Sequence, residues 1–267
     1  MSRLLDLMQR PEHPADCDDL LAVPAETAEI LPETRLVFHT DPRSPGADRY
    51  RFLRMRLRDL GASSKVKTLL VTSPLPHDGK STVCLNLATA LAEGGKKKVL
   101  LIEADLHQPA LAAKLGLDSW AGLAECLDGT VDPRSGMRRI DPLGWYLLPA
   151  GGSRANASEL LQTAALASVM SKLSPQFDWI IVDSPPVLPL TDATSLTRYA
   201  DATLLVARAD QTVREAIDET IAIVGRQRVV GIVLNGVNSL GRSYSKYYNS
   251  YRPSNSATAH AADKRDS

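Results

Sequence analysis

The stretch that decides the fold is KTLLVTSPLPHDGKST, residues 67–82. Its apolar first half predicts a buried strand, and residues 80–93 follow with a helical pattern. Strand, loop and helix in this order predict a phosphate-binding loop, because backbone N–H groups at the helix start point at phosphate and the helix dipole favours negative charge there. The strict pattern of such a loop is incomplete, since Pro74 stands where its first glycine belongs.

The loop is expected to hold the phosphates of ATP. We predict that Lys80 reaches the β- and γ-phosphates and that the Ser81 hydroxyl binds Mg²⁺. The loop residues predicted to contact the nucleotide are Pro76, His77, Asp78, Gly79, Lys80, Ser81 and Thr82. Because a Gly-Lys-Ser occurs often by chance, this prediction needs support from elsewhere in the chain.

Outward from the loop, short apolar strands alternate with helices. The expected strands are 98–104, 145–148, 179–183, 203–207 and 229–234, and the expected helices are 157–173 and 213–226. Continuous apolar runs such as WIIV at 179–182 are typical of strands that are buried on both faces of a sheet. The alternation therefore predicts an α/β fold, with a doubly wound, mostly parallel sheet flanked by helices.

Carboxylates stand at the ends of two of these strands. Glu103 and Asp105 end one strand, and Asp183 ends another that is otherwise apolar. Open parallel sheets bind ligands at this edge, so the acids are expected beside Lys80. A buried Asp183 without a partner would be costly, which makes Mg²⁺ or its bound water the natural partner, whereas Asp105 could equally cap a helix. Together these groups predict a site of phosphoryl transfer.

Composition excludes several classes of protein. Lys+Arg and Asp+Glu both number 31 in 267 residues, so charge gives no reason to expect nucleic acid as a partner. The three cysteines are widely spaced and show no metal-ligand pattern with histidine. No apolar run is long enough to span a bilayer and no signal peptide is evident, which predicts a cytoplasmic protein.

The chain is expected to have three parts. Residues 1–40 are predicted to form a flexible arm, residues 41–240 the P-loop domain, and residues 241–267 a disordered tail. Within the domain, residues 48–60 predict a basic helix with Leu53, Leu57 and Leu60 on one face.

Over roughly residues 45–251 the sequence resembles the bacterial tyrosine kinases (BY-kinases) of capsule and exopolysaccharide assembly, P-loop proteins related to ParA and MinD. The residues that carry the resemblance are Ser73, Pro76, Gly79, Lys80, Ser81, Thr82 and Asn86-Leu87-Ala88 at the loop, Glu103, Asp105 and Pro109 after the next strand, Asp183-Ser184-Pro185-Pro186 with Asp192 and Ala193, Asn156–Leu161, and Gly231–Asn235. The resemblance implies ATP and Mg²⁺ as cofactors. Ser81, Asp105 and Asp183 would organise the metal, and Glu103 would accept the proton of a tyrosine hydroxyl. For Asn235 it leaves two roles open, contact with adenine or capping of a strand end.

Two further features follow the same resemblance. Asp48, Arg51 and Arg54 have the spacing of the family's Glu-x-x-Arg-x-x-Arg, which implies an interface in a ring-like homo-oligomer. The tail carries a tyrosine cluster, Tyr244, Tyr247, Tyr248 and Tyr251, which the resemblance identifies as phosphoacceptors. Alternatively, the tyrosine rings could pack as one face of a helix, because their spacing allows it.

The expected function is that of an ATP-dependent protein-tyrosine autokinase that regulates capsular or exopolysaccharide synthesis and export. Expected partners are other copies of the chain, protein-tyrosine substrates and a membrane protein similar to the polysaccharide co-polymerases, which would hold the kinase at the inner face of the cell membrane.

Two alternatives remain. A ParA/MinD-like ATPase is disfavoured because Leu75 stands where those proteins have a signature lysine. A nucleotide-binding scaffold with weak catalysis is suggested by His77, Glu103 and His107, which replace the Gly, Asp and Arg of the kinase motifs.

Overall fold

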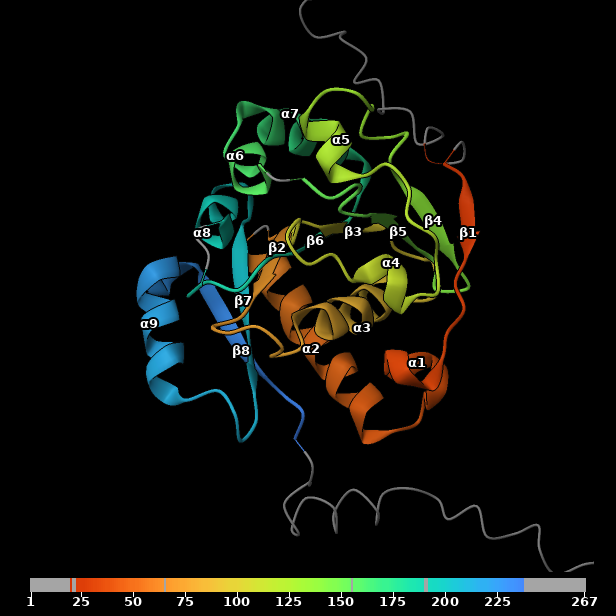
Figure 1. Ribbon diagram of the computed structural model, residues 1–267. Coiled ribbons are helices and arrows are strands. Elements are labelled where there is room, and N and C mark those ends of the chain that lie inside the picture. Colours follow the sequence, from red (N-terminus) through yellow and green to blue (C-terminus); the bar gives the residue numbers. More distant parts are fainter. Residues whose placement is uncertain (1–19, 21–22, 65, 155, 190–191, 238–267) are drawn as a thin grey trace, which may run out of the picture. The chain divides into compact units, whose positions relative to one another are not determined.

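A computed structural model of the protein describes residues 20, 23–64, 66–154, 156–189 and 192–237. Its centre is an eight-stranded sheet with the strand order β1-β4-β5-β3-β6-β2-β7-β8 (Figure 1). The strands are β1 (Ala25–Thr27), β2 (Thr68–Thr72), β3 (Val99–Glu103), β4 (Arg138–Asp141), β5 (Trp145–Leu148), β6 (Trp179–Asp183), β7 (Ala202–Arg208) and β8 (Val229–Asn235). Every neighbouring pair is parallel except β4 and β5, which confirms the predicted sheet.

Helices cover both faces of this sheet, as Figure 1 shows. They are α1 (Val37–Thr40), α2 (Pro45–Ser64), α3 (Lys80–Ala92), α4 (Leu111–Lys114), α5 (Leu123–Leu127), α6 (Ala157–Leu161), α7 (Ala164–Leu173), α8 (Asp192–Leu196) and α9 (Arg214–Val224). One apolar core joins α2 and α3 to the sheet, and a second joins α5, α6 and α7 to its other face. The doubly wound arrangement is therefore confirmed.

The strands around the phosphate loop are the most buried part of the chain. All residues of β2, β3 and β6 are buried, as expected for central strands without a solvent-facing side. The apolar face of α2 packs on the core through Leu57, which is buried, and through Leu53 and Leu60, which are partly buried. Elements from β1 to β8 belong to one compact unit that ends at Asn235.

Several elements differ from the sequence-based expectation. The helix expected at 157–173 is divided into α6 and α7, because Thr163 has an extended backbone and its hydroxyl donates to the carbonyl of Leu160 at 2.8 Å. Strands β1 and β4 were not predicted at all. Strand β1 lies within the predicted arm, yet it pairs in parallel with β4. Residues 1–19 lie outside the described part, so the arm itself stays a prediction. Among the residues described, no helix combines the length and the apolar character needed to cross a membrane.

Candidate active site at the phosphate loop

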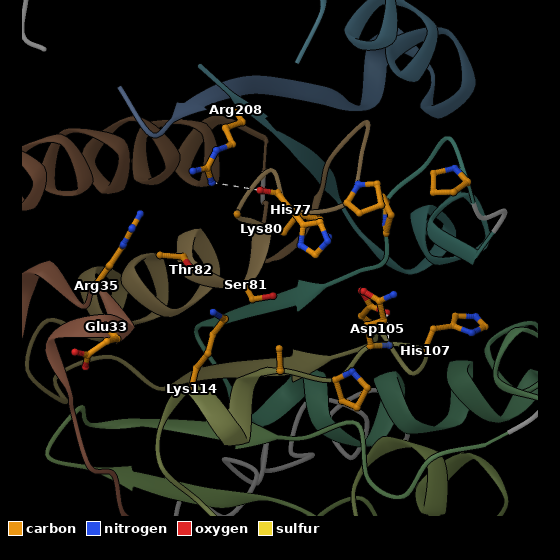
Figure 2. Close-up of a pocket in the computed structure, with 17 residues that line it drawn as sticks. Glu33, Arg35, His77, Lys80, Ser81, Thr82, Asp105, His107, Lys114 and Arg208 are labelled. Atoms are coloured by element: carbon orange, nitrogen blue, oxygen red, sulfur yellow. Dashed lines mark hydrogen bonds between the residues drawn. The ribbon is translucent and has the colours of Figure 1, made fainter. Parts of the chain in front are cut away.

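A cavity of about 870 Å³ opens where β2 ends and α3 begins. The loop, the segment after β3, helix α4, the end of β7 and the segment before α1 all contribute to it (Figure 2). The residues that line it are Glu33, Arg35, Pro76, His77, Gly79, Lys80, Ser81, Thr82, Asp105, His107, Gln108, Pro109, Ala110, Lys114, Pro186, Pro189 and Arg208. The groups that follow β2, β3, β6 and β7 are brought by these parallel strands to one edge of the sheet, where the sequence predicted the site.

The loop keeps its shape through two residues with left-handed backbone. His77 has φ 65° and Gly79 has φ 95°. Histidine tolerates this conformation better than most side chains, so it can stand where the kinase motif has glycine. Gly79 has a further constraint, because a Cβ at this position would collide with the side-chain amide of Asn235. That amide donates to the carbonyl of Asp78 at 3.0 Å. Asn235 therefore supports the loop, and its contact with adenine stays a prediction.

Asp78 also stabilises the loop through its side chain. One carboxylate oxygen accepts from the backbone N–H of Leu75 at 3.1 Å, and the other accepts from the Thr212 hydroxyl at 2.7 Å. Its side chain is buried and is not among those that line the cavity. Any contact of Asp78 with phosphate would therefore come from its backbone N–H, as is usual in such loops.

Asp183 is a buried acid whose two carboxylate oxygens have no well-formed hydrogen bond. It is 1% exposed, and neither carboxylate oxygen makes a hydrogen bond with a described residue. Burial raises the pKa of Asp183 to about 7, although the nearby positive charge of Lys80 opposes this rise. Lys80 is itself only 8% exposed and reaches the cavity from the first turn of α3. Such an orphaned acid is unusual in a folded chain and indicates a ligand.

The donor set fits Mg²⁺. Asp183 has two free oxygens in the interior, while Ser81 and Asp105 offer a hydroxyl and a carboxylate at the cavity wall. Across the described ranges, no three His, Cys, Asp or Glu side chains form a group that could hold a metal alone. This is expected for Mg²⁺ at a nucleotide site, because the ion keeps waters and takes phosphate oxygens as ligands. Asp105 also accepts from the backbone N–H of Gln108 at 3.1 Å, so its capping role and its cavity position coexist.

Glu103, the residue expected to act as a general base, is engaged elsewhere. It is 2% exposed and is not among the residues that line the cavity. One carboxylate oxygen accepts from the backbone N–H groups of Ala110 and Leu111 at 2.5 and 2.7 Å, and the other accepts from Ala150 at 3.1 Å. Burial raises the pKa of Glu103, while the three N–H groups oppose this rise. The acid that the structure brings to the cavity is Asp105.

A second polar cluster lies beside the site. His107 Nε2 is 2.8 Å from a carboxylate oxygen of Asp192, and the Ser158 hydroxyl donates to the same oxygen at 3.0 Å. Asp192 begins α8 and Ser158 lies in α6, so the cluster ties both helices to the segment after β3. These motif residues therefore have a structural role, and His107 also lines the cavity.

Three cations at the cavity were missed by sequence reasoning. They are Arg35, Lys114 and Arg208. Arg208 ends a strand at the ligand-binding edge, a signal that could have identified it, and it donates to the carbonyl of His77 at 3.4 Å. No sequence signal marks Arg35, which lies in the predicted arm, or Lys114, which lies in a short helix that was not predicted.

The residues predicted for oligomerisation make contacts within the chain. Arg51 bonds Asp48 at 2.7 Å and the carbonyl of Pro42 at 2.7 Å, and Arg54 donates to the carbonyl of Ala90 at 3.2 Å. The interface with another copy stays a prediction. The four predicted phosphoacceptors, Tyr244, Tyr247, Tyr248 and Tyr251, lie outside the described residues.

Comparison with known proteins identifies the family of this chain. The sequence model of the AAA domain family matches residues 78–228, more than half of the chain. The tyrosine-protein kinase ptk of Acinetobacter johnsonii is 33% identical over 188 residues, which are 70% of this chain and 25% of that protein. The tyrosine-protein kinase YwqD of Bacillus subtilis is 28% identical over 219 residues, covering 81% of this chain and 92% of that protein. The succinoglycan biosynthesis transport protein ExoP of Rhizobium meliloti is 30% identical over 238 residues, 83% of this chain and 30% of that protein. The chain thus spans about a quarter of the Acinetobacter relative but nearly all of the Bacillus one.

Two solved structures are similar to this chain in fold. The kinase domain of VpsO superposes with a TM-score of 0.63 at 30% identity, covering 73% of this chain and 100% of that one. The cobyrinic acid a,c-diamide synthase of Mycobacterium smegmatis, solved with an ATP analogue and magnesium, has a TM-score of 0.53 at 25% identity, over 69% of this chain and 78% of that one.

Proposed function

Since this chain belongs to the bacterial tyrosine kinase family of P-loop AAA domains, we propose that it transfers the γ-phosphate of ATP to tyrosine hydroxyls with the help of Mg²⁺. The observation that carries this proposal is Asp183, a buried carboxylate with two unbonded oxygens at the base of the phosphate loop. Such an acid needs a cation, and a nucleotide-bound Mg²⁺ supplies one.

The phosphate loop and the acids near it have proposed tasks. Lys80 and the backbone N–H groups at the start of α3 hold the β- and γ-phosphates. Ser81, Asp105 and Asp183 hold the magnesium ion, which when bound neutralises the charge that develops on the transferred phosphoryl group. Phosphoryl transfer needs mainly positioning and electrostatic stabilisation, so a strong general base is not required. Asp105, which reaches the cavity, is the proposed acceptor for the tyrosine proton, and Glu103 holds α4.

The acceptors and the biological setting are part of the same proposal. Tyr244, Tyr247, Tyr248 and Tyr251 receive phosphate from a neighbouring copy, in an assembly that uses Asp48, Arg51 and Arg54 of α2. The name of ExoP, a succinoglycan biosynthesis transport protein, supports a role in the synthesis and export of capsular or extracellular polysaccharide. A membrane protein similar to the polysaccharide co-polymerases would hold the kinase at the inner face of the membrane.

The test is autophosphorylation in vitro. Purified protein is incubated with ATP and Mg²⁺, and phosphotyrosine is measured by immunoblot and mass spectrometry. We expect phosphotyrosine in the wild type and in Lys96→Met, which removes an exposed lysine from the turn before β3, and none in Lys80→Met. Release of inorganic phosphate without phosphotyrosine would favour a ParA/MinD-like ATPase. Nucleotide binding without either product would favour a scaffold.

A further inference from the structure

One wall of the cavity carries two cations that the proposed transfer chemistry does not use. Arg35 and Lys114 both line the cavity that Lys80 enters, and Figure 2 shows them on the side of Ser81 away from His107. Neither side chain makes a hydrogen bond or an ion pair with any residue in the described ranges. By contrast, Arg208 at the same cavity is bonded to the loop carbonyl of His77. Two cations that face a cavity without partners are available to an anionic ligand.

Arg35 is held in place by the helix that carries the phosphate loop. Asn86 of α3 is 1% exposed, and its side-chain amide donates to the carbonyls of Arg35 at 3.0 Å and of Thr82 at 2.9 Å. Its amide oxygen accepts from the backbone N–H of Val37 at 2.9 Å. Arg35 has φ 53°, and its own N–H donates to Pro32 at 3.1 Å. The backbone of Arg35 is therefore fixed relative to Ser81 and Thr82, which limits the entropy lost when its side chain binds a ligand.

Lys114 is held by a second set of buried contacts. It is the last residue of α4, and the first turn of that helix is fixed by the two hydrogen bonds to Glu103. The backbone N–H of Glu29 donates to the carbonyl of Leu115 at 3.0 Å, which ties the segment that leads to Arg35 to the end of α4. The wall is therefore continuous. Glu33 also lines this wall, so the net charge of the wall formed with Arg35 and Lys114 is positive but small.

Phosphorylation reverses the electrostatic interaction between the acceptor segment and this wall. Residues 241–254 contain four tyrosines, Arg242, Lys246 and Arg252, and no carboxylate. An unmodified tail is therefore cationic and would be repelled by this wall. One phosphotyrosine adds a charge of about −1.5 to −2 and three acceptor oxygens, for which arginine has a matching geometry.

We propose that Arg35 and Lys114 form a subsite for a phosphotyrosine on the acceptor segment, next to the tyrosine that enters the active site. The subsite rests on the proposed tyrosine kinase function and deepens it, because it makes an acceptor that already carries one phosphate the preferred one. Phosphorylation of the cluster would then proceed faster after its first step. Glu33 opposes binding and limits the preference.

The test is peptide binding, which needs no phosphoryl transfer. Two labelled peptides of residues 241–254, one unmodified and one with phosphotyrosine at Tyr248, are titrated with the Mg-ADP-bound protein, and fluorescence anisotropy gives each dissociation constant. We expect the wild type to prefer the phosphopeptide about 10-fold, the effect of one charge-assisted hydrogen bond. The double variant R35Q/K114Q should reduce the preference to less than about 2-fold.

Two single variants complete the test: one removes the opposing charge of the wall, and the other is a control outside the cavity. Glu33→Gln should increase the preference, since it removes the opposing charge. Arg226→Gln, which removes an exposed arginine that does not line the cavity, should leave the preference unchanged. Equal binding of both peptides by the wild type would overturn the proposal. So would a double variant that loses affinity for Mg-ADP but keeps its preference, because the two cations would then serve the nucleotide. If no phosphotyrosine forms in the kinase assay while the preference is found, the subsite stands and the transfer reaction fails.

Discussion

Asp183, the buried acid beside the phosphate loop, should make the protein without ligand less stable as pH rises. Asp183 has a folded-state pKa of about 7, raised by burial from 3.8. Between these values the folded state keeps a proton that the unfolded state has lost, so the free energy of unfolding falls as pH increases. Above pH 7 the cost reaches an upper value of about 4 kcal/mol, from about 1.36 kcal/mol for each tenfold change in proton affinity. Asp183→Asn removes this ionisation and should therefore stabilise the protein at alkaline pH.

Urea denaturation without nucleotide or Mg²⁺ measures the effect. The free energy of unfolding is compared for the wild type and D183N at about pH 5 and about pH 8.5, and the difference between variant and wild type should become more favourable by about 2–4 kcal/mol as pH rises. The comparison across pH cancels any fixed cost of burying an amide. Asp118→Asn, at an exposed position, should show no such change. A pH-independent difference for D183N, or one of opposite sign, would refute the reasoning.

A second consequence at the same residue concerns ligand binding. Mg-ATP at about 100 times its dissociation constant should stabilise the wild type by about 2.7 kcal/mol. Asp183→Asn should lose most of this gain while keeping its higher stability without ligand. Stabilisation of both proteins to the same extent by Mg-ATP would show that Asp183 does not serve the metal.

Three further results are expected. Glu103→Gln should lower the free energy of unfolding by about 1–3 kcal/mol in urea, because an amide cannot accept all three backbone hydrogen bonds; unchanged stability with reduced phosphoryl transfer would restore Glu103 as the general base. Asn86→Ala should cost about 2–3 kcal/mol in the same assay, since it leaves the N–H of Val37 and the carbonyl of Arg35 without their partner, and a loss below about 0.5 kcal/mol would contradict its role. The thiol of Cys84 should resist alkylation in the native protein, because burial raises its pKa well above the usual range, and peptide mass spectrometry after iodoacetamide treatment would reveal any reaction.

The central strands could be predicted from sequence because they are buried on both faces of the sheet, where apolar residues are required. Strand β6 is a continuous apolar run that ends in a charge, and its predicted bounds agree with the structure. The edge strands offered no such signal. Strand β4 reads Arg-Arg-Ile-Asp, and only Ile140 in it is buried. Strand β1 has no buried residue at all. Both form because a neighbouring strand pairs with them, and such pairing depends on tertiary contacts that no local pattern records.

The site was predictable where a residue's role follows from its place at a strand end. Lys80, Asp105 and Asp183 meet at one edge of the sheet, because parallel strands end together there. Which of two neighbouring acids reaches the ligand was not predictable from spacing. Glu103 is the last residue of β3 and so points to the same face as Leu101, toward the core on the α3 side. Asp105 follows the end of the strand and is free to turn toward the cavity.

Glu103 and Asn86 show why a motif residue need not touch the ligand. Both are buried, and their side-chain oxygens accept from backbone N–H groups. Glu103 accepts at the start of α4 and from Ala150, and Asn86 accepts at the segment that carries Arg35. Without them, two short stretches of chain would have unsatisfied backbone groups at the rim of the cavity, at a cost of about 1–3 kcal/mol for each. Glu103 and Asn86 thus position Lys114 and Arg35, and through these two cations they influence which acceptor binds in the cavity. A substitution of either residue should therefore affect the preference for the phosphorylated acceptor more than the affinity for ATP. The phosphopeptide titration with Asn86→Ala separates the two effects. Loss of ATP affinity with an unchanged phosphopeptide preference would show that Asn86 supports the phosphate loop alone.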